Sequence, residues 1–478
     1  MHAALIVVIL GLVGCSHDAR MRPTVEAFSR GAYAKAEETF EPLLEQRRES
    51  AKDRLLYELE AGMIFATAGD DQRSLDAFAF ADEHSWRFLD EAPDVRVSEQ
   101  AAALLLNQTI VEYRGTSYDR ILCNTYQALN HLARHDLERA GVSLRRAYEW
   151  QRDAVEKNAK EIETLEDKAD AAGRKQGYDT ESTLRDPQVK GSLDSAYGAI
   201  REMRGYAEFA VPYSTYLQSL QQMLTGRADA AAQATVGFRK AAGMLRDADR
   251  AYAEADALAA EEASIGKRPP AMVYVLLESG MGPALKEFKI SIPLPLRTVP
   301  YVGASFPVLH FEPGGPSGFT ARAGSASFQS SLLTDMDQVV AGDFNRRLPA
   351  IIALTLVSSA GKAVGTYFAQ EAAGGHDSDA AIVVAIAGAV FQAATNSADL
   401  RIWRTLPKEV LYARFPAPAD GLIHLDLGDG QRIGPIAVES EESGGATIVH
   451  LRVPSSGATA AIRTMRFPST ASHELQPS

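Results

Sequence analysis

Three places in the chain bring together residue types that can bind a metal ion or a phosphate. His131 and His135 are four residues apart in a helical pattern, but no glutamate completes a HExxH metal motif. Residues 280–286 (GMGPALK) begin like a phosphate loop but lack the final Gly-Lys-Ser/Thr, so a turn is expected. In the loop 376–379 (HDSD), Asp379 suits a helix N-cap better than a metal site. No nucleophile and base pair up by spacing either, so we predict a protein that is not an enzyme and has no cofactor or metal.

Cys15 is the residue whose surroundings favour a specific chemistry. It ends an apolar run that starts at Ala3, too short to span a bilayer but typical of a secretory signal peptide. Residues 12–15 (LVGC) resemble the bacterial lipoprotein signal, in which the cysteine thiol forms a thioether with lipid. We therefore expect a signal peptide over residues 1–14, an acylated Cys15 carrying palmitate-type chains, and a lipid-anchored tether over 15–22. The alternatives are an ordinary secretory signal or a buried N-terminal helix.

The resemblance to that signal also implies a location. In proteins that carry it, a serine after the cysteine usually accompanies the outer membrane, and Ser16 occupies that position. The chain is thus expected to be lipid-anchored at the outer membrane and to face the periplasm.

Composition narrows the classes of partner. The chain of 478 residues has a formal net charge of −13, which argues against nucleic acid and against electrostatic attachment to anionic lipid. Two cysteines exclude a disulfide framework, and Cys123 lies in a helical pattern where a small buried side chain is expected. The length favours two or three domains.

Residues 23–262 show the small-residue spacing of tetratricopeptide (TPR) helical hairpins. In such a repeat, Gly62 would let one helix approach its partner and Gly69 would make the turn between them. The alternative is a generic helical bundle with small residues at those spacings. The matching positions are Gly31, Ala32, Tyr33, Ala36, Phe40 and Leu43; Gly62, Phe65, Gly69, Ser74, Phe78 and Ala81; Ala128, Leu137, Ala140, Leu144 and Ala147; and Ser219, Gly226, Ala228, Ala231 and Phe238.

A charged stretch interrupts this array at about 149–210. Apolar residues are sparse over 150–172 and charges of opposite sign alternate, so this part is expected to form a solvated helical hairpin that projects from the domain.

The second half changes to β patterning. Residues 269–345 and 399–468 hold apolar alternation typical of strands, at 271–277, 286–292, 301–311, 322–333, 409–415, 421–427, 446–453 and 459–467. We predict an α+β protein: an N-terminal TPR-like α-helical repeat domain, then a β-rich domain with an inserted Ala/Gly-rich helical hairpin, and a disordered tail at 469–478. Whether the β segments form one domain is left open.

The inserted hairpin, residues 346–398, has two helical runs with small residues every fourth position, beginning at Gly361 and at Ala381. Such ridges allow close helix packing. Burial against the β domain is favoured, because alanine is weakly hydrophobic and Lys362 interrupts the first run. Insertion into a membrane or oligomerisation is the alternative.

Three stretches carry a family resemblance, at 113–130 (YRGTSYD and NTYQALN), 280–290 and 398–407. With these, the chain resembles an uncharacterised family of proteobacterial outer-membrane lipoproteins with TPR-like helices. Members are encoded beside lipoproteins that look like activators of peptidoglycan synthases, which implies cell-envelope assembly. The motif residues given a structural role are Gly282, Pro283, Asp399, Arg401, Trp403 and Pro407.

Read physically, Arg401 would neutralise the C-terminus of the second Ala-rich helix and Trp403 would lock the chain into the next strand. The expected function is a scaffold or adaptor that binds other envelope proteins through the concave repeat face, with Tyr126 and Tyr216 as candidate contact residues. The alternative is a membrane-active oligomer, a pore or secretion accessory, that uses residues 348–398.

Overall fold

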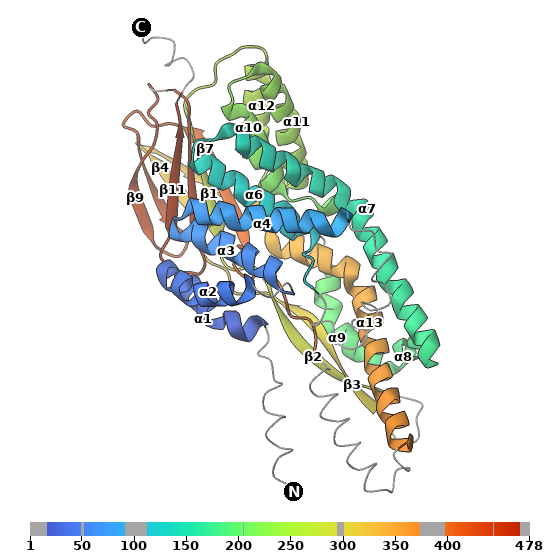
Figure 1. Ribbon diagram of the computed structural model, residues 1–478. Coiled ribbons are helices and arrows are strands. Elements are labelled where there is room, and N and C mark those ends of the chain that lie inside the picture. Colours follow the sequence, from blue (N-terminus) through green and yellow to red (C-terminus); the bar gives the residue numbers. More distant parts are fainter. Residues whose placement is uncertain are drawn as a thin grey trace.

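The computed structural model of the protein describes residues 17–48, 52–90, 112–203, 205–293, 301–372, 397–442 and 444–468. Cys15, the signal peptide, the loop 376–379, the second Ala-rich run and the tail at 469–478 lie outside these ranges. The helices of the first half lie over one side of the sheets, and a long arm formed by α7 and α13 extends from the body (Figure 1). The α+β class predicted from the sequence is confirmed.

Consecutive helices of the first half pack against one another. The neighbouring pairs include α1·α2, α3·α4, α6·α7, α10·α11 and α11·α12. Gly69 ends α3 with a φ of +94°, and a Cβ on Gly62 would overlap the Phe78 ring of α4, as the predicted close approach requires. The helices are α1 (His17–Ser29), α2 (Tyr33–Arg48), α3 (Arg54–Ala68), α4 (Asp71–Asp90), α6 (Ser117–Ala133), α7 (Leu137–Gln176), α8 (Thr180–Arg185), α9 (Pro187–Glu202), α10 (Pro212–Leu224), α11 (Ala228–Met244) and α12 (Ala251–Ser264).

The expected tether at 15–22 is wrong from residue 17 onward, because α1 begins there. The His17 ring lies edge-on to Tyr57 of α3 with 5.1 Å between ring centroids. Asp18 pairs with Arg404 at 2.5 Å, and Met21 is buried. These contacts with distant parts of the chain turn the start of this segment into a docked helix.

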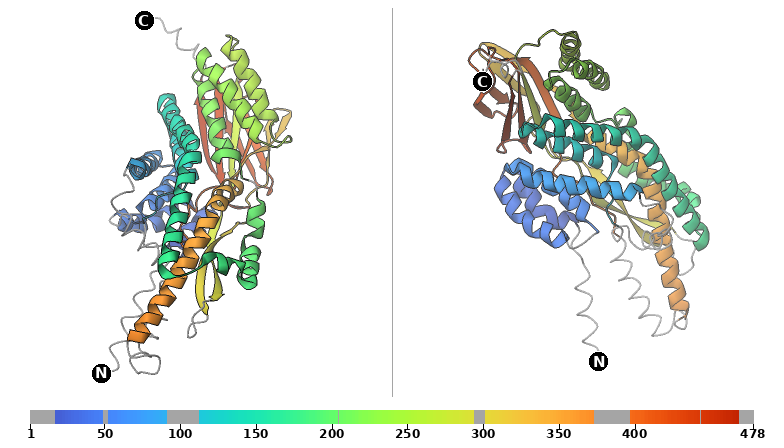
Figure 2. Two further views of the ribbon diagram at one scale, coloured as in Figure 1. Left: turned by 90° about the vertical axis from the view of Figure 1, so that its right-hand side faces the viewer. Right: turned by 45° about the horizontal axis from the view of Figure 1, so that its top comes forward.

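The charged segment at 149–210 contains two helices joined by a loop, as predicted, but the expected hairpin is wrong in its pairing: α7 packs along α13 and not along α9. α7 continues as one helix of 40 residues, and its second half lies along α13 (Met336–Ala372), as Figure 2 shows. Arg347 of α13 donates to Asn158 at 2.9 Å and pairs with Glu161 at 3.3 Å. α9 packs on the two-stranded sheet, where the Tyr197 hydroxyl donates to the carbonyl of Pro307 at 2.9 Å. Glu161, one of the charged residues of α7, therefore helps to join α7 to α13.

Strands from both β segments pair in a five-stranded sheet. Its strand order is β11-β10-β1-β7-β6, with β1 parallel to β10 and antiparallel to β7. The side chains of β1 alternate between two cores: Tyr274 and Leu276 pack with the helices, and Val273 and Val275 pack with the four-stranded sheet β5-β4-β8-β9. The layers are therefore helices, five-stranded sheet and four-stranded sheet. The strands are β1 (Met272–Ser279), β2 (Ala284–Pro293), β3 (Tyr301–His310), β4 (Phe319–Ala323), β5 (Ala326–Gln329), β6 (Ser331–Asp335), β7 (Glu409–Pro416), β8 (Leu422–Leu427), β9 (Arg432–Ala437), β10 (Ala446–Val453) and β11 (Ala461–Phe467).

Two details of the strands differ from the prediction. The single strand expected over 322–333 is divided among β4, β5 and β6, with a turn at Gly324, whose φ is +58°. β9 was not predicted, since its sequence contains Gly434 and Pro435, which usually interrupt strands.

α13 begins at Met336, ten residues before the predicted hairpin, and runs through Pro349. A Cβ on Gly361, the first small residue of its ridge, would meet the side chain of Gln176 of α7 within 3.0 Å. Within the described residues, none of the helices combines the length and apolar content that crossing a membrane requires.

Candidate functional site

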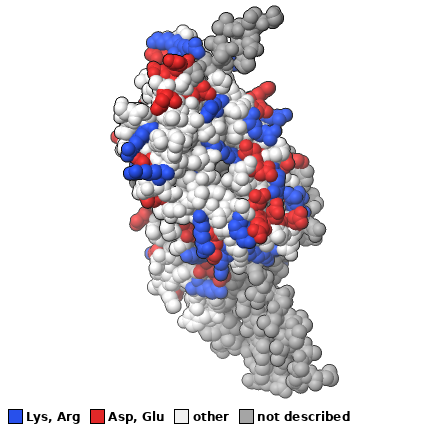
Figure 3. All heavy atoms as spheres, turned by 90° about the vertical axis from the view of Figure 1, so that its left-hand side faces the viewer, with Lys and Arg blue, Asp and Glu red and all other residues white. Residues whose placement is uncertain are grey.

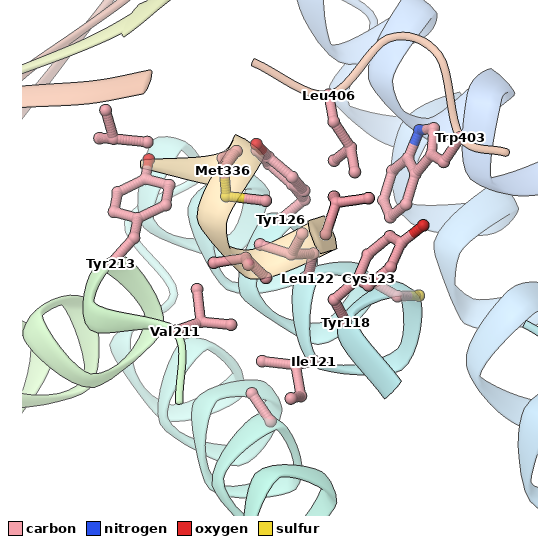
Figure 4. Packing of buried hydrophobic residues seen from close by; sticks show 14 of the residues in the cluster. Tyr118, Ile121, Leu122, Cys123, Tyr126, Val211, Tyr213, Met336, Trp403 and Leu406 are labelled. Carbon is pink, nitrogen blue, oxygen red and sulfur yellow. The ribbon is translucent and has the colours of Figure 1, made fainter. Parts of the chain in front are cut away.

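An extended segment, residues 397–408, lies between the helices and the sheet; it contains the third motif stretch and contacts the other two. Trp403 is 1% exposed and packs against both Phe78 and Tyr126, with 6.0 Å between ring centroids in each pair. Figure 4 shows Trp403 and Leu406 beside Tyr126 of α6. The segment thus occupies the helical face on which the sequence predicted a partner.

Two arginines tie this segment to the first helices. Arg401 contacts Asp53 at 2.8 Å and Asp399 at 2.6 Å. Burial opposes the charge of Arg401, but these two carboxylates raise its pKa above the usual value. Arg404 pairs with Asp18 of α1 at 2.5 Å and with a second carboxylate near β3. The helix that Arg401 was expected to neutralise lies outside the described residues.

Glu60 of α3 holds the backbone of the same segment. Its carboxylate accepts from the N–H of Arg404 at 2.6 Å, the N–H of Thr405 at 3.2 Å and the Thr405 hydroxyl at 2.7 Å. Burial raises the pKa of Glu60 to about 7, and these hydrogen bonds oppose that rise. Because Glu60 accepts three hydrogen bonds from one extended segment, its role is to hold that segment in place and not to bind a substrate.

The glycine turn at 280–283 docks on the other side of this segment. The N–H of Gly282 donates to the carbonyl of Leu406 at 2.7 Å, and a Cβ there would lie 3.4 Å from the Cβ of Leu406. The buried Arg452 donates to the carbonyls of Gly280 at 2.6 Å and Thr405 at 3.2 Å. The N–H of Gly282 and the carbonyl of Gly280 are thus hydrogen-bonded within the chain, in agreement with the predicted turn.

The first motif stretch completes this arrangement. Tyr113 donates to Asp119 at 2.6 Å, and the Arg401 guanidinium lies 5.6 Å from the centre of the Tyr113 ring. The three stretches, far apart in sequence, therefore meet around residues 397–408. We call this region, with Glu60 and Asp53, the buried junction.

The candidate partner contacts Tyr126 and Tyr216 are 4% and 0% exposed, so their expected place on an open face is wrong. Tyr216 of α10 donates to Asp256 of α12 at 2.6 Å and lies edge-on to Tyr412 of β7. Burial raises the pKa of Asp256 to about 6, although the nearby Arg414 opposes the rise. The sheet and the 397–408 segment cover the face that carries both tyrosines.

A second buried polar cluster lies where β1 ends. Glu278 accepts from Tyr213 at 3.1 Å and pairs with His450 at 3.0 Å. Burial disfavours its charge, but His450 and Arg452 lower the pKa of Glu278 below the usual value. No motif or spacing in the sequence pointed to Glu278, Arg452 or Glu60. The available signal was a charged residue inside an otherwise apolar strand or helix.

An open groove lies between α8, α9 and α13 and has a volume of about 720 Å³. We call it the α9–α13 groove. Pro349 has no N–H, so it cannot donate the usual helical hydrogen bond to the backbone carbonyl of Asn345. The side-chain Oδ1 of Asn345 is buried and has no hydrogen-bond partner within the described residues. The lining residues are apolar (Leu184, Leu193, Leu348, Pro349 and Ile352) or polar (Arg185, Lys190, Asp194, Arg201 and Asn345).

In the described ranges, no group of three or more His, Cys, Asp or Glu side chains is placed to hold a metal ion. No family model matches the chain, and no curated protein or solved structure matches it.

Proposed function

We propose that this protein is a lipid-anchored scaffold of the cell envelope that binds other envelope proteins, in outer-membrane or peptidoglycan assembly. The helices would be a degenerate TPR-like array whose inner face is filled by the protein's own sheet and the 397–408 segment. With the proposed lipid at residue 15, the docked α1 places the start of the folded body directly at the bilayer.

The observation that carries the binding role is the α9–α13 groove. Its apolar lining can take apolar side chains, and the charged side chains that line it can select a polypeptide by ion pairs and hydrogen bonds. The partner site is thus proposed on the outer side of the array. Elsewhere, on the face that Figure 3 shows, positive and negative side chains are interspersed.

The alternative, a membrane-active oligomer built from residues 348–398, has less support. The described part of that segment already has neighbours within the chain, because Gly361 packs on Gln176. Burial lowers the pKa of Lys362 to about 8, which is consistent with a lysine packed against protein.

Photo-crosslinking in cells tests the adaptor role. A crosslinking residue at the exposed positions 190 and 194 of α9 samples the groove, and one at Val236 of α11, which is 68% exposed, is the matched control. We expect the same envelope proteins from both groove positions and not from 236. A crosslinker at the buried Tyr126 should reach only this chain.

Equal recovery from groove and control positions would contradict the proposal, as would no recovery at all. If the groove positions capture a second copy of this chain, the surface is a homo-oligomer interface instead.

A further inference from the structure

The start of α1 is held against the body by several elements. Asp18 pairs with Arg404 of the 397–408 segment, and the His17 ring packs on Tyr57 of α3. Further along the helix, Met21 and Phe28 are 1% and 0% exposed. The first turn of α1 is therefore a fixed part of the body.

Only two residue steps separate this fixed point from the proposed lipid. Two residues of extended chain span at most about 7 Å, so Cys15 stays within that distance of His17. A free tether over 15–22 would instead reach roughly 25 Å if fully extended. The lipid is thus attached almost directly to the folded body.

We infer that the protein sits on the bilayer in one fixed orientation, with the surface around His17 against the lipid headgroups. This inference rests on the proposed lipid at Cys15. Arg22 of α1, five residues from His17, is exposed and offers a positive charge that headgroup phosphates can bind. α11 and α12 lie far from α1 in the fold (Figure 1), so in this orientation they are held away from the bilayer. The orientation of the folded body relative to the bilayer is fixed. Its partner-binding surfaces therefore lie at constant distances from the membrane.

The test attaches the lipid chemically, so that it does not depend on lipidation in cells. The chain from Cys15 onward is joined to a maleimide phospholipid, while Cys123 is 2% exposed and shielded from the reagent. The protein is then bound to phosphatidylcholine vesicles with acceptor dye on the headgroups. Donor dyes are placed through an unnatural amino acid at position 22 or at position 236. We expect several-fold more energy transfer from position 22.

A flexible insertion provides the decisive variant. A Gly/Ser linker of about 12 residues between Ser16 and His17 spans roughly 20 Å and should bring the two transfer efficiencies close together. The same linker added after Ser478 is the control and should leave the several-fold difference intact.

Equal transfer from positions 22 and 236 without the linker would overturn the inference. So would a difference that survives the linker before His17. Mass spectrometry of the protein from cells separately checks acylation of Cys15. A missing acyl group there would refute the anchor proposal while leaving the vesicle result on geometry standing.

Discussion

The buried junction and the α9–α13 groove use the same residue types in opposite ways. In the junction, the side chains of Arg401 and Arg404 are 7% and 10% exposed, and each contacts two carboxylates. In the groove, Arg201 and Asp194 pair at 2.8 Å with 44% and 52% of their side chains exposed. Buried charges must be paired, whereas exposed pairs stay available to a partner.

This difference shows which part of the protein the three motif stretches specify. The motif stretches converge on the junction, where the described polar groups of Glu60, Arg401 and Gly282 are bonded within the chain. The groove has no such motif. Distinctive residues here specify internal packing, and the surface proposed to bind a partner consists of ordinary surface residues.

Trp403→Ala should show the largest effect. Removing this buried ring leaves a cavity beside Phe78 and Tyr126, and we expect a loss of about 4 kcal/mol in the free energy of unfolding. Tyr301→Ala, at an aromatic residue that is 57% exposed, is the control and should cost less than about 0.5 kcal/mol. Denaturant unfolding measures both, and equal losses would contradict the assignment of the junction to stability.

Glu60→Ala should come next. It leaves the N–H groups of Arg404 and Thr405 buried without an acceptor, and we expect a loss of about 3 kcal/mol at pH 7. Glu60→Gln keeps one acceptor oxygen and should recover part of the loss. The control Glu38→Ala removes an exposed pair with Lys35 and should change stability by less than about 0.5 kcal/mol. A Glu60→Ala protein as stable as this control would refute the role of Glu60.

His17 should make stability depend on pH. Burial lowers its pKa from 6.5 to about 3, so at intermediate pH the unfolded chain binds a proton that the folded chain excludes. Stability is then fully present above pH 6.5 and falls as the pH drops towards 3. Relative to His17→Phe, the wild type should lose about 2 kcal/mol between pH 7 and pH 5.

Denaturant unfolding at both pH values checks this, with His310→Phe, at an exposed histidine, as a control that keeps the wild-type slope. Parallel pH profiles for the wild type and His17→Phe would show that α1 is not docked through His17.

Asp194→Lys should have the smallest effect on stability. Because the pair with Arg201 is exposed, we expect a change below about 0.5 kcal/mol. The same change reverses a charge on the rim of the α9–α13 groove and should sharply reduce crosslinking from position 190. Unchanged crosslinking would move the partner site away from this groove.

Local patterns of the sequence determined most of the elements. Apolar alternation located strands such as β1, β7 and β10, and the spacing of Gly62 and Gly69 predicted a tight helical turn, because these signals depend on neighbouring residues. The lipid anchor at Cys15 and the binding of envelope proteins stay predictions.

Only the tertiary structure decided which surfaces are open. Tyr126 has the pattern of a groove residue, yet Trp403, nearly three hundred residues later, covers it. His17 lies in a polar stretch, yet Tyr57 and the Asp18–Arg404 pair convert that stretch into a docked helix. A sequence specifies local conformation through short-range sterics and periodicity, whereas burial depends on which distant segments pack together.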